Sequence, residues 1–98
     1  MNKDQVEISL NKLLPNILPE YVTDISFDVH RTSPNEFMLK ALFGVSDDYW
    51  DSLNSINKAA FTHKVKMKLQ NKINSYINIW VEFDRGLTTF IKQSDFPK

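Results

Sequence analysis

Three lysines on one predicted helix have the residue type and spacing that most suggest chemistry. Lys64, Lys68 and Lys72 recur every four residues at the start of a segment that reads HKVKMKLQNKINSYINIWVEFDRG. Residues four apart share one side of an α-helix, so these ammonium groups would form a ridge. The ridge could hold a phosphate backbone, or it could be a solvated flank whose methylene stems cover the core edge. We favour the solvated flank, because the sequence shows no arginines or exposed aromatic residues interleaved with these lysines.

Catalytic and metal-binding patterns have little support in the sequence. The two histidines, His30 and His63, stand in no metal-ligand spacing and in no motif with a nucleophile. Asp47, Asp48 and Asp51 follow Ser46 and resemble a helix N-terminus more than a calcium loop. The chain has no cysteine and two glycines, which excludes thiolate chemistry and a glycine-rich phosphate loop. We therefore expect no enzyme, no cofactor and no metal site.

Length and charge indicate one balanced domain. A chain of 98 residues fits a single domain, with a core over about residues 3–84 and residues 85–98 as a C-terminal tail or an extra strand. Twelve basic and twelve acidic residues cancel, so any binding to nucleic acid would need a local patch. We expect a protein partner or a homo-oligomer, with nucleic acid as an alternative and no membrane.

Neither a signal peptide nor a membrane span is evident in the sequence. The opening residues MNKDQVEISLNKLL mix charges with apolar positions, and no apolar run approaches the roughly 18 residues of a span. A cytoplasmic protein, or one inside a particle assembled in the cytoplasm, is expected. Ten lysines against two arginines, with abundant asparagine and isoleucine, suggest an A/T-rich coding genome, as in many phages, viruses and bacteria.

The first half of the chain predicts one helix and a hairpin. Apolar residues at helical spacing predict a helix over about 3–14, which Pro15 should stop or kink. From residue 22 the period is two, with Ile25, Phe27 and Val29 on one side of a strand. The turn segment RTSPNE then leads to a second strand over about 37–45.

The second half predicts a short helix, a long helix and a third strand. The short helix should end near residue 53, and the long helix should span about 56–76. Its buried stripe would be Phe61, Val65, Leu69, Ile73 and Tyr76. Alternation over 77–83 predicts the third strand, whereas Leu87 to Ile91 could form a fourth strand or lie as a tail.

The element order αββααβ predicts an α+β fold. With a right-handed crossover from the second to the third strand, the helices would cover one face of a small sheet of three strands, or of four, giving a two-layer sandwich. Over most of residues 3–84 this order resembles that of type II KH domains. KH domains grip nucleic acid through a Gly-x-x-Gly loop between paired helices. Here that junction reads LNSINKAA and holds no glycine.

The face of the sheet away from the helices is the second candidate site. Met38, Leu42 and Trp80 should lie outward together with His30 and Lys40, and the acidic residues Asp28, Glu82 and Asp84 should surround them. A contiguous apolar patch on an exposed face commonly marks a partner interface. The alternative is that the C-terminal segment, with Phe90, Ile91 and Phe96, folds back over this face.

Two functional hypotheses follow. The first is a non-enzymatic protein-protein interaction module, a small structural or accessory subunit of a larger assembly, for which a phage or viral origin would suit the small size. Its partner-binding residues would be Met38, Leu42, Trp80 and Phe90. The second is a KH-like nucleic-acid-binding domain that uses the lysine ridge, with Lys40 and Arg31 adding to it.

Overall fold

The computed structural model describes residues 2–98 and confirms the α+β class and the predicted element order. Its elements, in chain order, are α1 (Lys3–Ile17), β1 (Val22–Ser33), β2 (Glu36–Val45), α2 (Asp47–Asp51), α3 (Ser55–Tyr76), β3 (Trp80–Phe83), β4 (Thr89–Lys92) and the 3-10 turn η1 (Gln93–Asp95). The C-terminal segment, for which the sequence allowed either a strand or a tail, therefore forms a strand at residues 89–92.

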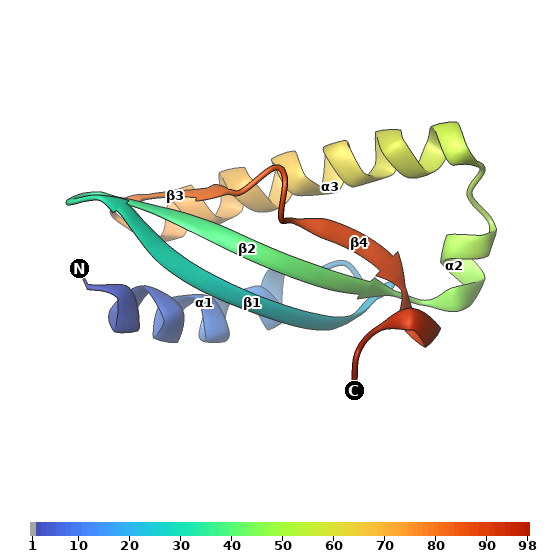
Figure 1. Ribbon diagram of the computed structural model, residues 1–98, viewed down its shortest axis with the longest axis horizontal. Helices are drawn as coiled ribbons and strands as arrows, with labels where there is room; N and C mark the ends of the chain where they lie inside the picture. Colours follow the sequence, from blue (N-terminus) through green and yellow to red (C-terminus); the bar gives the residue numbers. More distant parts are fainter. Residues whose placement is uncertain (1) are drawn as a thin grey trace.

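The four strands form one mixed sheet in which β2 pairs with each of the others. β1 runs antiparallel to β2 on one side, and β3 and β4 run parallel to it on the other. β3 pairs with the first part of β2 and β4 with its last part, so the two occupy one edge position in succession (Figure 1). Between them, the amide of Asp84 and the hydroxyl of Thr88 both donate to the carbonyl of Leu39, at 2.9 and 3.1 Å.

One face of the sheet forms the core with α1 and α3. On β2 the odd-numbered residues are buried, and Phe37, Leu39 and Phe43 are fully enclosed. The same cluster holds apolar residues of both long helices, which pass behind the sheet in Figure 1; they are Val6, Leu10, Leu13, Leu14, Phe61, Val65, Leu69 and Ile73. The even-numbered residues of β2 lie on the opposite side, which we call the open face.

The end of α1 and the buried stripe of α3 differ from the sequence predictions. α1 continues through Pro15 to Ile17, because a proline in the last turn removes a single hydrogen bond while the amide of Leu18 still donates to Leu14 at 3.0 Å. Tyr76 was predicted on the buried stripe, but it is 61% exposed. Steps of four residues from Ile73 lead to Ile77, the C-cap residue, which takes the buried position instead.

Two side-chain amides on α3 complete the hydrogen bonding of β3. The side chain of Asn74 accepts from the amide of Val81 at 2.9 Å and donates to the carbonyl of the same residue at 2.8 Å. Gln70 accepts from the amide of Phe83 at 2.9 Å and also donates to the carbonyl of Val81. These bonds satisfy backbone groups of β3 that β2 does not reach, so α3 takes the place of a neighbouring strand.

Replacing Asn74 with leucine should destabilise the domain by about 1–3 kcal/mol, because the amide of Val81 would be left without a partner. The matched control is Asn71→Leu on the exposed side of the same helix, for which we expect a change within about 0.5 kcal/mol. Urea unfolding of both variants measures the difference. Equal stabilities would show that the amide bonds to β3 contribute nothing.

Candidate functional site

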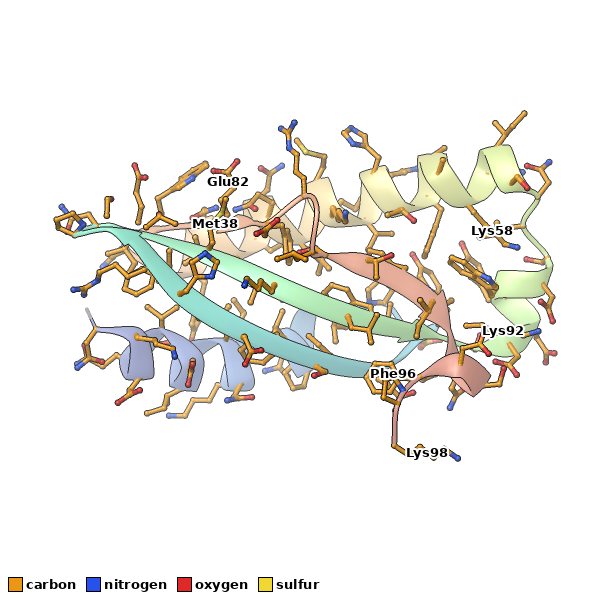
Figure 2. The ribbon with its side chains drawn as sticks, viewed as in Figure 1. Met38, Lys58, Glu82, Lys92, Phe96 and Lys98 are labelled. Carbon is orange, nitrogen blue, oxygen red and sulfur yellow. The ribbon has the colours of Figure 1, made fainter. Side chains whose placement is uncertain are left out.

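Cross-strand pairing fixes the layout of the open face. Met38 lies between His30 on β1 and Glu82 on β3, and Lys40 lies opposite Asp28 on β1. Figure 2 shows the side chains of Met38 and Glu82 next to each other over the β2–β3 end of the sheet. An apolar residue of the central strand is thus flanked on both sides by polar residues of the outer strands.

The apolar residues of the open face come from β2 and β3. Leu42 lies between Ser26 on β1 and Thr89 on β4, and both Met38 and Leu42 are half-buried. Trp80 lies on β3 at the far end, opposite Glu36 and one row from Met38, a spacing that an indole ring can bridge. We call Met38, Leu42 and Trp80 the open-face stripe.

Trp80 points outward, as the sequence predicts. It is 50% exposed, whereas its neighbour Val81 is 1% exposed, because period two turns adjacent side chains to opposite faces. The indole N–H donates to a carboxylate oxygen of Glu82 at 3.3 Å. This bond holds the ring along the strand and leaves an apolar surface available to solvent.

Phe90, which the sequence analysis grouped with the partner-binding residues, lies in the core and not on the open face. It is 4% exposed, its ring stacks on Phe43 at 4.7 Å between centroids, and Phe61 meets it edge-on at 5.5 Å. The reason is register: Phe90 pairs with Phe43, a core-facing residue of β2. The sequence does not show which face of the sheet Phe90 lies on, because the same segment could be either a strand or a tail.

The C-terminal segment covers one end of the open face. A Cβ at Gly44 would lie 3.2 Å from the ring of Phe96, so the absence of a side chain there lets the tail approach (Figure 2). Asp47 accepts a hydrogen bond from the amide of Ser94 at 3.0 Å, and Lys92 pairs with Asp51 at 3.0 Å. The stripe residue Trp80 lies at the opposite end of β2 from this cover.

The lysine ridge lies on the helix side of the sheet. Lys64, Lys68 and Lys72 line one wall of a groove whose other wall is formed by residues 16–21. Lys40 lies on the open face and does not extend the ridge. Arg31 places its guanidinium 5.2 Å from the centre of the Phe37 ring and is not among the residues that line the groove.

Sequence reasoning missed two aromatic residues of this groove. Tyr21 and Tyr49 also line it, and their rings stack in parallel with centroids 4.1 Å apart. Phe61 packs against both at 5.3 and 5.6 Å. Tyr21 precedes β1 and Tyr49 lies in α2, so the two rings meet only through tertiary folding. No spacing in the sequence predicts this contact.

Within residues 2–98, three ionisable groups have shifted pKa values. Burial raises the pKa of Tyr21 above its usual 10.0, and the adjacent hydroxyl of Tyr49 adds to this. The hydrogen bond to Asp51 raises the pKa of Lys92. Burial, helped by the charge of Arg85, lowers the pKa of Lys66. Of these groups, Tyr21 alone is in the groove.

Among residues 2–98, no three or more histidine or acidic side chains are grouped to hold a metal ion. Two of the three aspartates around α2 have structural partners, because Asp47 accepts from the tail and Asp51 pairs with Lys92. In the same part of the chain, no helix is long and apolar enough to cross a membrane.

Substituting serine for Trp80 should cost far less stability than the same change at Phe83. Phe83 is 5% exposed and meets Phe43 edge-on, so its loss leaves a cavity and buries a hydroxyl, at about 3–5 kcal/mol. Trp80→Ser removes a half-exposed ring, and we expect about 1 kcal/mol. Thermal unfolding measures both. If the two variants unfolded equally early, the register of β3 would be wrong.

Stability should fall at high pH in a way that depends on Tyr21. Its folded pKa lies above the unfolded value of 10.0, so the folded state holds the proton more tightly. The stabilisation is therefore complete below the unfolded pKa and is lost as pH rises through the folded one. The unfolding free energy measured from about pH 8 to about pH 11 should fall more steeply for the wild type than for Tyr21→Phe. Parallel curves would contradict the assignment.

Comparison of the chain with protein-family models, curated proteins and solved structures finds no match. The candidate functional sites of the protein are the open-face stripe and the lysine-lined groove.

Proposed function

We propose that the protein is a non-enzymatic interaction module, a small structural or accessory subunit that docks into a larger assembly through the open face of its sheet. The observation that carries the proposal is Trp80, half-exposed on β3 at the end of the face that α1 and α3 leave uncovered, and diagonal to Met38 on β2. A partner surface that buries Met38, Leu42 and Trp80 away from water would gain binding free energy.

The composition of the face supports a protein partner. Tryptophan and methionine are enriched in protein interfaces, and the energetic centre of an interface is typically an aromatic anchor inside a polar rim. Here Trp80 and Met38 supply the apolar part, and His30, Asp28 and Glu82 stand beside it. The indole bond to Glu82 reduces the freedom that Trp80 would lose on docking.

A second copy of the chain is the occupant that the charges favour. The open face carries both signs, with Lys40 in the middle and Asp28 and Glu82 on the outer strands. In a two-fold contact each surface meets itself, so a face of one sign would repel its copy, whereas a mixed face can set acidic groups against basic ones. The net charge of zero also removes long-range repulsion between copies.

Light scattering over a concentration series tests the proposal. The wild type should associate, and Trp80→Ser should shift the equilibrium to monomer. Ile56→Ser is the matched control, because Ile56 is an 80% exposed apolar side chain at the start of α3, away from the open face. We expect this variant to associate as the wild type does.

A partner other than a second copy gives a different outcome. With the three proteins as bait in extract from the native source, a protein retained by the wild type and by Ile56→Ser but lost with Trp80→Ser would be a heterologous partner of this face. A wild type that stays monomeric and retains no protein in a Trp80-dependent manner would contradict the proposal.

A further inference from the structure

The groove between α1 and α3 combines a charged wall with an aromatic end. Lys64, Lys68 and Lys72 follow one another along α3. Each lies about one helical turn from the next, which is a rise of about 6 Å along the helix axis. Tyr21 and Tyr49 form the aromatic part. The groove has a volume of about 620 Å³, which is within the range of ligand sites.

The lysines are available to a ligand. Within the described part of the chain, ion pairs join Lys3 to Glu7 and Lys92 to Asp51, and none involves the three groove lysines. Glu20 is the acidic side chain of the groove lining, so the lining carries more positive than negative charge. Three like charges at four-residue spacing repel one another, and an anion bound along the ridge would relieve that repulsion.

The aromatic pair points to the class of anion. A stacked pair of phenol rings has a flat outer surface on which a nucleobase can lie, and base stacking on aromatic residues works for any base. Grooves that bind single strands combine such a platform with a positively charged track for the backbone. Tyr21 and Tyr49 are half-buried residues that both line the groove, so each has surface that a ligand can reach.

We propose that this groove binds single-stranded nucleic acid, with phosphates along Lys64, Lys68 and Lys72 and a base against the Tyr21–Tyr49 pair. The site goes beyond the proposed function, because it uses the helix side of the sheet and none of the open-face stripe residues. Lysine binds a phosphate as a point charge, and the stacked rings of Tyr21 and Tyr49 give a nucleobase, but not a carboxylate, a flat surface on which to lie. An acidic peptide is therefore the less favoured occupant.

Fluorescence anisotropy of a labelled twelve-nucleotide oligothymidylate tests the proposal on the intact protein. Binding at low salt should weaken with a log–log slope of about −2, since each of three neutralised phosphates on a single strand contributes about −0.7. A fourfold rise in salt should thus weaken binding roughly 18-fold. Lys64→Ala/Lys68→Ala/Lys72→Ala should abolish most of this binding and flatten the slope.

The control variant removes the same charge elsewhere. Lys3→Ala/Lys12→Ala/Lys98→Ala changes three exposed lysines that do not line the groove, and it should bind with nearly wild-type affinity. Tyr21→Leu, at constant charge, should weaken binding of the oligonucleotide but leave binding of inorganic polyphosphate unchanged. Circular dichroism confirms that each variant is folded before its affinity is compared.

Four results would overturn the proposal. They are no wild-type binding at low salt, equal losses in the two triple variants, an equal effect of Tyr21→Leu on both ligands, and competition by polyglutamate as strong as that by the oligonucleotide. Trp80→Ser should bind the oligonucleotide as the wild type does. The experiments can therefore contradict the proposed interaction module and the proposed nucleic-acid site independently of each other.

Discussion

The alternation of side chains along β2 is the constraint on which the rest of the structure depends. β1, β3 and β4 each pair with β2. Both long helices pack on the face of the sheet that carries Phe37, Leu39 and Phe43. A shift of one residue in its register would bury Lys40 and expose two phenylalanines, which the domain could not tolerate. Burial of the core face therefore also fixes which residues lie on the open face. The open-face stripe is positioned by the same packing that folds the protein.

The edge formed by β3 is closed from within the domain. Edge strands present unpaired backbone groups that can recruit another chain, and proteins often cover them. Here Gln70 and Asn74 supply the hydrogen bonds that a further strand would supply, while their own backbone stays in the helix. Two polar residues that flank the buried stripe of α3 thus have a structural role. A partner that approaches β3 meets the face of this strand, where Trp80 lies, more readily than its edge.

Sequence patterns predict the parts of this fold that depend on a local period. The alternation of β1 and β2, the outward position of Trp80 and the buried stripe from Phe61 to Ile73 are all confirmed. The parts that depend on long-range pairing were not predictable. The side of Phe90 is set by its pairing with Phe43, and the Tyr21–Tyr49 stack joins residues from two separate segments. The predicted burial of Tyr76 is wrong for a geometric reason, because Ile77 lies four residues after Ile73 and takes the buried position.

The Tyr21–Tyr49 stack changes the balance between the two interpretations of the lysine ridge. A solvated flank explains why Lys64, Lys68 and Lys72 stand beside the buried stripe, since their stems cover its edge. It does not explain why the lysines share a groove with two stacked rings, at a repulsion cost of about 0.2–0.5 kcal/mol for each like-charged pair. In the sequence, both arginines and exposed aromatic residues were missing from the ridge, which favoured the solvated flank. Folding brings two aromatic residues there, Tyr21 from the residue before β1 and Tyr49 from α2, so the aromatic part of that objection no longer holds. The balanced net charge leaves room for one local anion site.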